Sequence, residues 1–231
     1  MKGQPKLQLA VISLARTPER WKGLINRVGK QPWPISRVWG VDGLLLSNIE
    51  LSHLQSRGII SPSCLSWPKG QIGCALSHIL CWKLCIERKI PTLILEDDAL
   101  LSKDWVEQVK IALEKVPEKE WDLLLLGWNQ DSLLEIEWTK SLSATLLCRP
   151  RFPSKLDLQF TLNQTQPRTW VRLRKGLGLA GYIISPKGAS RLLEWSQPIK
   201  TIEIKNQELP TRCCFSLDGQ LNDIYNDLSA W

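Results

Sequence analysis

Three adjacent carboxylates, Glu96, Asp97 and Asp98, directly follow the apolar run Leu93 to Leu95. Burying three like charges together is unfavourable, so we expect them to emerge at the carboxyl end of a strand, where open α/β sheets place their ligand crevice. Strand alternation predicts Glu96 and Asp98 on one side and Asp97 on the other. Such a cluster suits Mg²⁺ or Mn²⁺, whose shell a substrate diphosphate completes. Alternatively, the acids only offset the dipole of a helix beginning near Ser102.

The elements around this triplet alternate between apolar strands and helical patterns, which is typical of an α/β domain. Residues 70 to 88 form the clearest helix, because apolar side chains recur there at three- and four-residue spacing. From 47 to 69 we expect a small helix and a loop, and from 141 to 175 loops with short strands. The expected strands are 7–14, 33–43, 90–95, 121–128 and 181–185, and the other expected helices begin near 18, 102 and 186.

The composition predicts a single domain over residues 1–231, because the chain can bury a substantial core and shows no repeat or linker. Its first residues lack the apolar stretch of a secretory signal, so we expect a cytoplasmic protein. Seven cysteines without a CxxC pair indicate neither a disulfide framework nor a structural zinc site. Cys81 and Cys85, one helical turn apart, are interpreted as buried reduced thiols.

A net charge of +7 favours anionic partners such as phosphates, nucleic acid or an acidic lipid surface. Twelve tryptophans can fill cores and also stack on bases or sugars. We expect no nucleic-acid partner, because no recognised binding motif appears and the acidic triplet would repel a phosphate backbone. A steeply salt-dependent oligonucleotide affinity would revive that hypothesis.

Six segments in this order resemble glycosyltransferase family 25, the lipooligosaccharide-type galactosyltransferases that also include the procollagen galactosyltransferases. The segments are Val11-Ile12-Ser13-Leu14 with Arg16 and Arg20; Val41-Asp42-Gly43; Gly70 to His78; Leu95 to Ala99; Gly181 to Ser185 with Gly188-Ala189; and Leu217 to Leu221. The resemblance covers nearly the whole chain. It departs from the family pattern before Asp218, where Leu217 and the approach through Cys213-Cys214-Phe215 are unusual.

The resemblance implies a GT-A-type, Rossmann-like nucleotide-sugar-binding fold with a central, mostly parallel sheet. It implies a UDP-sugar donor, a divalent cation (Mn²⁺ or Mg²⁺), and inversion by direct attack of an acceptor hydroxyl. The candidate metal ligands are Asp98 and Glu96, and the candidate catalytic carboxylates are Asp218 and Asp97. The candidate donor-binding residues are Arg16, Arg20, Asp42, Gly73, Ser77, His78 and Glu96.

Several of these residues also have a purely structural interpretation. Arg16 and Arg20 can meet phosphate through their planar guanidinium groups, or simply begin a solvated helix. His78 lies at the edge of an apolar stripe, where a lone His is usually a satisfied structural residue, with Ser77 facing the other way. Asp218 is either a general base or substrate-holding group, or a turn residue before a glycine.

The basic stretch 168–175 alternates like a strand, with Arg168, Trp170, Arg172 and Arg174 on one side. A solvated strand face is the first interpretation, and the second is contact with an anionic acceptor, a lipid-linked glycan or a membrane surface.

The leading hypothesis is a transferase that moves a hexose, galactose by analogy, to a glycan acceptor of lipopolysaccharide or another cell-surface glycan. We expect peripheral association with the inner face of the membrane. The alternative is a non-catalytic protein of the same fold that binds a nucleotide sugar or a glycan, since fold does not guarantee chemistry.

Overall fold

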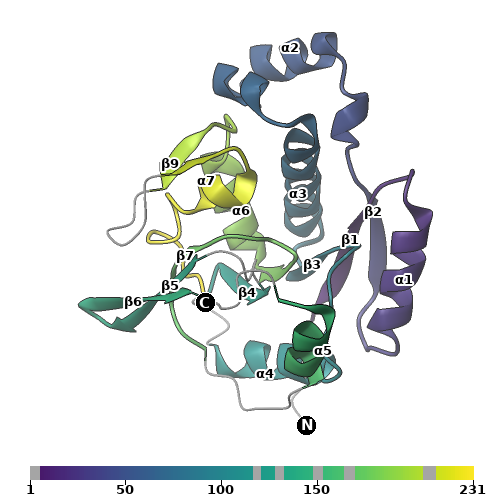
Figure 1. The fold of residues 1–231 in the computed structure, drawn as a ribbon, viewed down its shortest axis with the longest axis vertical. Helices are drawn as coiled ribbons and strands as arrows, with labels where there is room; N and C mark the ends of the chain where they lie inside the picture. The colour runs from purple at the N-terminus through teal and green to yellow at the C-terminus, as the bar shows by residue number, and fades with distance from the viewer. Residues whose placement is uncertain (1–5, 117–120, 128–132, 148–152, 164–169, 205–211) are drawn as a thin grey trace.

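The computed structural model describes residues 6–116, 121–127, 133–147, 153–163, 170–204 and 212–231, and shows an α/β fold around a five-stranded sheet (Figure 1). In spatial order the strands are β2 (Ile35–Trp39), β1 (Gln8–Ser13), β3 (Thr92–Glu96), β8 (Gly181–Ile184) and β4 (Leu123–Gly127). β1 pairs in parallel with β2 and β3, whereas β8 runs antiparallel to β3 and β4. The predicted α/β class with a mostly parallel central sheet is confirmed.

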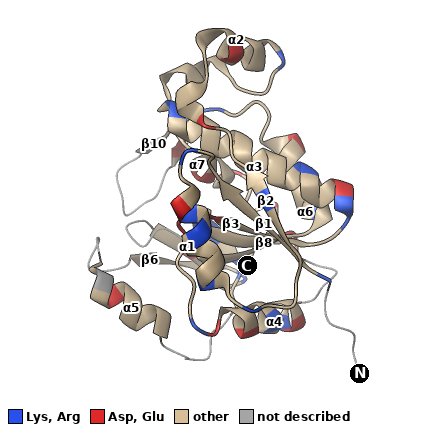
Figure 2. Ribbon diagram, turned by 90° about the vertical axis from the view of Figure 1, so that its right-hand side faces the viewer, with Lys and Arg blue, Asp and Glu red and all other residues tan. Residues whose placement is uncertain are grey.

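Helices cover both faces of this sheet because its strands are apolar on both sides. Alternation along β1 sends Leu9 and Val11 into one hydrophobic cluster and Ala10 into the other. α1 (Pro18–Val28) and α4 (Trp105–Lys115) contribute to the first cluster, and α3 (Lys69–Arg88) and α6 (Pro186–Trp195) to the second. Figure 2 shows α3 and α6 on one side of the sheet and α4 on the other.

α3 is the helix that the apolar stripe predicted, and it spans Lys69–Arg88. Ile72, Ala75, Ile79 and Trp82 on that stripe are all at most 3% exposed. The helix ends at Lys89, whose φ of 54° is left-handed and closes the last turn. α3 packs against α6 and against the 3₁₀ turn η1 (Gly43–Leu45). Its first half lies beside Glu96, at the carboxyl end of β3.

The remaining elements surround this core. They are α2 (Asn48–Ser56), η2 (Pro62–Ser66), β5 (Leu133–Thr139), β6 (Leu142–Leu147), α5 (Lys155–Asn163), β7 (Leu173–Gly176), β9 (Ile202–Ile204), β10 (Arg212–Cys214) and α7 (Leu217–Leu221). β6, β5 and β7 form an antiparallel sheet. The expectation of only loops and short strands in 141–175 was wrong for α5. That helix is capped at its start, where Ser154 Oγ accepts from the amide of Asp157 and the Asp157 carboxylate accepts from the amide of Ser154.

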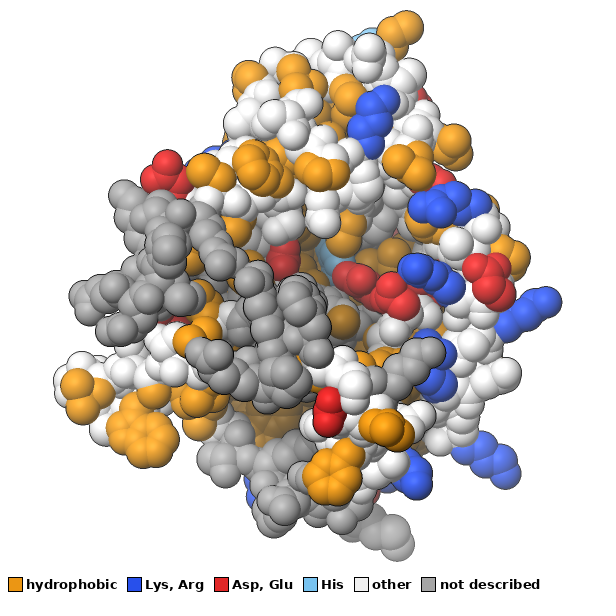
Figure 3. Space-filling model, viewed as in Figure 1, with side chains coloured by type: hydrophobic (Ala, Val, Ile, Leu, Met, Phe, Trp, Pro, Cys, Tyr) orange, Lys and Arg blue, Asp and Glu red, His pale blue; other side chains and the backbone are white. Residues whose placement is uncertain are grey.

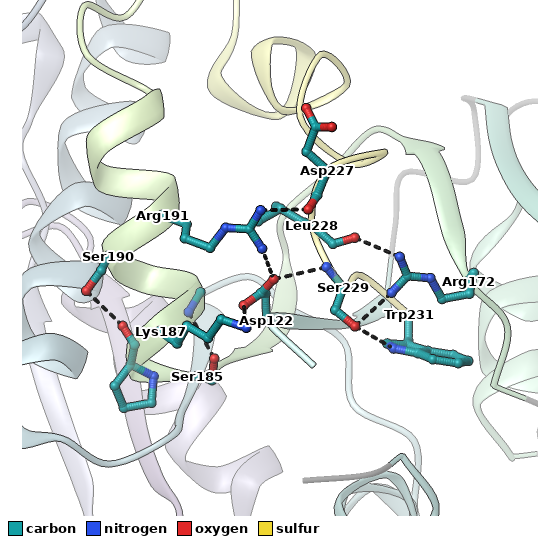
Figure 4. Close-up of polar contacts among 12 residues, drawn as sticks. Asp122, Arg172, Ser185, Lys187, Ser190, Arg191, Asp227, Leu228, Ser229 and Trp231 are labelled. Carbon is teal, nitrogen blue, oxygen red and sulfur yellow. Dashed lines mark hydrogen bonds and ion pairs between the residues drawn. The ribbon is translucent and has the colours of Figure 1, made fainter. Parts of the chain in front are cut away.

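The last residues of the chain are anchored beside β4 by Asp122, whose side chain is 1% exposed (Figure 4). Asp122 pairs with Arg191 and Lys187 of α6, and its Oδ2 accepts from the amide of Ser229 at 3.0 Å. Arg172 donates to Ser229 Oγ at 2.8 Å on the other side of that segment. A buried carboxylate thus joins α6, β4 and the chain end.

Cys64, Cys81 and Cys85 are free cysteines and are buried, which confirms the predicted burial of the last two. Within the described ranges, no helix has both the length and the apolar character needed to span a bilayer.

Candidate functional site

The acidic triplet lies where predicted, at the carboxyl end of β3. Glu96 is the last residue of the strand, and its amide donates to Ala180 O at 3.1 Å. A turn follows at once, because the amide of Ala99 donates back to Glu96 O at 3.0 Å. The strand alternation from which we predicted the sides of Asp97 and Asp98 ends at Glu96, because the strand stops before Asp97.

Two arginines of α1 hold this turn. Arg20 Nη1 lies 3.0 Å from Asp98 Oδ2 and 3.8 Å from Asp97 Oδ1. Arg27, which the sequence interpretation missed, donates to the carbonyl oxygens of Asp97 and Ala99, at 3.2 Å in both cases. Its only sequence signal is the spacing of seven residues from Arg20, which places both on one helical face. Positive charge therefore approaches the triplet from α1.

The electrostatics of the triplet favour a bound cation. Burial, together with the negative charges of Glu96 and Asp97, raises the pKa of Asp98 despite the opposing charge of Arg20. Asp97 is 7% exposed, and its Oδ2 has no hydrogen-bond partner among the residues that the structure describes. An orphaned carboxylate oxygen beside a second crowded carboxylate fits a hard divalent cation, which prefers oxygen ligands.

His78 is fully buried and connects α3 to this triplet. Its Nε2 lies 3.2 Å from Glu96 Oε1, and its Nδ1 lies 3.0 Å from the hydroxyl of Tyr182, which also accepts from Trp82 Nε1 at 2.8 Å. Burial opposes protonation of His78, but the adjacent Cys74 and Glu96 raise its pKa to about 10. Burial likewise opposes ionisation of Glu96, but His78 and Arg20 lower its pKa below the ordinary value.

The predicted donor-binding residues Gly73 and Ser77 face protein backbone. A Cβ at Gly73 would lie 2.4 Å from Val41 O and 2.5 Å from Gly43 N, so only glycine allows α3 to approach this closely. Ser77 Oγ accepts from the amide of Val41 at 2.8 Å and donates to Gly73 O. The 70–78 segment of α3 therefore packs directly against the 41–43 turn.

Asp42 and Arg16 are brought together at this turn. Asp42 Oδ1 accepts from the amide of Leu44 and caps η1, while Oδ2 lies 2.6 Å from Arg16 Nε. The side chain of Arg16 remains 53% exposed. Arg16 is thus held at the surface and can still reach a phosphate with the other nitrogens of its guanidinium group.

Asp218 lies in the first turn of α7, and its Oδ2 accepts from the amide of Gly178 at 2.7 Å. Gly178 is two residues before Ala180, whose carbonyl oxygen accepts a hydrogen bond from the backbone amide of Glu96. The 178–180 segment therefore links Asp218 to the triplet through the backbone, and no direct contact between their side chains is found among the described residues.

A hollow lies near the middle of the face that Figure 3 shows, with acidic and basic side chains gathered beside it. A cavity of about 400 Å³ is lined mainly by apolar side chains, among them Trp105, Trp170, Trp231 and the two residues that flank the triplet in sequence, Leu95 and Ala99. Flat indole faces can stack on sugar rings.

In the described part of the basic stretch, Arg172 and Arg174 make contacts within the chain. Arg172 bonds to Ser229 and Leu228, and Arg174 pairs with Glu137 of β5. Leu173 is buried on the opposite side, as the alternation predicted. Arg168 lies outside the described residues.

Comparison with known proteins identifies one family over most of the chain. The model of glycosyltransferase family 25 (LPS biosynthesis protein) matches residues 7–208. Human procollagen galactosyltransferase 2 is 26% identical over 137 residues, which are 56% of this chain and 22% of that protein. Lipooligosaccharide biosynthesis protein lex-1 of Haemophilus influenzae is 30% identical over 138 residues, 59% of this chain and 40% of that protein.

A third relative, mouse inactive glycosyltransferase 25 family member 3, is 30% identical over 130 residues, 53% of this chain and 22% of that protein. The matches thus cover less than half the length of each of these three relatives.

Proposed function

The chain belongs to glycosyltransferase family 25, and from that premise we propose that it transfers a hexose, galactose by analogy, from a UDP-sugar to a glycan acceptor with inversion. The observation that carries the proposal is the triplet at the end of β3. It combines the orphaned Oδ2 of Asp97, the crowded carboxylate of Asp98 and the adjacent Arg20. Crowded acids beside an arginine suit a cation and the diphosphate that it neutralises.

The residues around the triplet would divide the work of donor binding. Asp98 and Glu96 would hold Mn²⁺ or Mg²⁺, with Asp97 as a further oxygen donor, and the cation would supply charge neutralisation for the departing diphosphate. Arg20 would orient the phosphates from α1, and Arg16 would do so from the neighbouring loop.

Transfer with inversion needs a group that removes the proton from the attacking acceptor hydroxyl. Asp218 is the first candidate and Asp97 the second. A hydrogen bond from the backbone of Gly178 fixes Asp218. Asp97 is buried directly in the triplet. The carboxylate that serves as the base would accept the proton while the hydroxyl oxygen attacks the anomeric carbon from the face opposite UDP.

For the acceptor we propose a glycan of lipopolysaccharide or another cell-surface glycan, including lipid-linked forms. This rests on the name of the Haemophilus influenzae relative and on the tryptophan-lined cavity to which Leu95 and Ala99 contribute. We further propose a cytoplasmic location with peripheral association at the inner membrane face, supported by the net charge of +7.

The second candidate function is non-catalytic binding of a nucleotide sugar or glycan on the same fold. The observation that favours it is the 30% identity to a mouse relative named inactive. The two functions differ in turnover and share donor binding, so one set of measurements separates them.

The test uses the purified protein with Mn²⁺ and a panel of UDP-sugars. We expect UDP with Mn²⁺ to raise the melting temperature, because a ligand that binds only the folded state stabilises it, and we expect hydrolysis or transfer from at least one UDP-sugar. Asp98→Ala should weaken UDP binding, whereas Glu194→Ala, an exposed acid on α6, should leave it unchanged. Binding without turnover would support the second function. Absence of turnover together with unweakened UDP binding by Asp98→Ala would overturn the transferase proposal.

A further inference from the structure

Cys74, His78 and Glu96 form a second cluster of metal-ligating side chains. Cys74 and His78 lie one turn apart on α3 and project from the same face of the helix toward the end of β3. Cys74 Sγ lies 4.0 Å from Glu96 Oε1, and His78 Nε2 lies 3.2 Å from the same oxygen. All three ligand atoms lie within 4.8 Å of one another.

These separations are close to those around a small tetrahedral ion. Zinc binds nitrogen and oxygen at about 2.0–2.2 Å and sulfur at about 2.3 Å, so tetrahedral angles place the nitrogen and oxygen about 3.3 Å apart and the sulfur and oxygen about 3.5 Å apart. The distance from His78 to Glu96 already agrees with this geometry. A small rotation of the Cys74 side chain would shorten the 4.0 Å distance from its Sγ to Glu96 Oε1.

The surroundings of His78 orient it as a ligand. Its Nδ1 contacts the Tyr182 hydroxyl, which is held in turn by Trp82 Nε1, and these three side chains are all fully buried. Outer partners of this kind fix the ring of a metal-binding histidine and direct its other nitrogen at the ion. The ring therefore presents Nε2 toward Cys74 and Glu96.

One side of the cluster faces solvent. The side chain of Glu96 is 32% exposed and Cys74 is half-buried, whereas His78 is fully buried. Three protein ligands with one open side resemble the arrangement in which zinc keeps a position for water or substrate. Sulfur and imidazole favour zinc-class ions over Mg²⁺ or Mn²⁺, which prefer all-oxygen shells.

We propose that Cys74, His78 and Glu96 bind a zinc-class divalent cation, with a fourth position open to solvent. This ligand set differs from the one proposed for the donor's cation in having a thiolate and an imidazole. The two sets share only Glu96. Binding of the ion is independent of turnover, so it can be tested separately from the transferase proposal.

Cobalt is the probe, because a thiolate–Co²⁺ bond gives a near-ultraviolet charge-transfer band and four-coordination gives intense visible bands. When the whole protein is titrated with Co²⁺, the charge-transfer band and the visible bands should both saturate at one equivalent of the ion. Cys74→Ser should abolish the charge-transfer band, and Glu96→Gln should weaken Co²⁺ binding by at least about tenfold. Cys213→Ser, which removes an exposed thiol on β10, should change neither the charge-transfer band nor the affinity for Co²⁺.

Displacement completes the test. Zn²⁺ should remove the cobalt bands stoichiometrically, and a large excess of Mg²⁺ should leave them intact. A protein that develops no charge-transfer band, a band that survives Cys74→Ser, or displacement by Mg²⁺ would each overturn the proposal. Circular dichroism of Cys74→Ser verifies that loss of the band does not reflect loss of the fold.

Discussion

Replacing Gly73 with alanine tests the inference that the 70–78 segment is a packing device. The added Cβ would lie 2.4 Å from Val41 O and 2.5 Å from Gly43 N, where ordinary contact begins at about 3.4 Å. Both obstacles are backbone atoms and cannot rotate away, so α3 and the 41–43 turn must separate by about 1 Å.

The cost follows from two opposing effects. Overpacking typically costs about 1–3 kcal/mol, and alanine returns up to about 1 kcal/mol of helix propensity. Because backbone meets backbone, we expect the upper end of the cost, a net loss of about 2 kcal/mol. For a chain of this size that corresponds to a fall in melting temperature of about 4–8 °C.

Gly70→Ala is the matched control, because it lies in the same helix and an added Cβ there would meet nothing within 4 Å. We expect it to be neutral or stabilising by up to about 1 kcal/mol. Urea denaturation and thermal melting of both variants provide the measurement. If Gly73→Ala is as stable as Gly70→Ala, the close approach of helix and turn is not the reason for glycine, and the packing inference fails.

Three other predictions concern buried charges and thiols. Asp122→Ala should cost about 1–3 kcal/mol in urea denaturation, because it removes the buried acceptor of the Ser229 amide, while Arg191 and Lys187 remain partly exposed to solvent. At pH 8 a thiol reagent should label Cys213 and spare Cys81, whose pKa burial raises to about 12; peptide mass spectrometry reads out both sites. In the metal-free protein the pKa of His78 is raised from 6.5 to about 10, so the stabilisation that its protonated ring provides should be complete below about pH 6.5 and decline as pH rises toward 10. Unfolding free energies of wild type and Glu96→Gln should therefore differ more at pH 6 than at pH 10.

Local patterns predicted the elements that have strong periodicity or continuous apolar character. The buried run before Glu96 and the stripe on α3 are signals of this kind, and both elements formed. The β5–β6 hairpin was missed because its turn, Lys140-Ser141, lacks the glycine or asparagine that usually marks a two-residue turn. α5 was missed although Ser154 and Asp157 have the spacing of a helix cap.

The candidate site was predictable in position and less so in its contacts. The chain placed its acids at a strand end because three adjacent carboxylates cannot be buried together. Nothing local, however, pairs Arg27 with the carbonyls of the turn, or Tyr182 with His78, since those partners are separated by 70 or more residues. Such contacts arise from the packing of α1 and α3 against opposite faces of the sheet.

The geometry of α3 gives the 70–78 segment two packing partners. Gly73 and Ser77 face the 41–43 turn, while Cys74 and His78, one position further along the helix, face Glu96. Each pair is spaced by four residues, so two adjacent stripes of one helix align two separate segments. This packing fixes α3 beside the triplet and does not itself require turnover. Activity depends instead on whether the acids act on a bound donor. Turnover therefore decides between the two proposed functions, and the comparison of Asp98→Ala with Glu194→Ala tests the donor binding that both of them share.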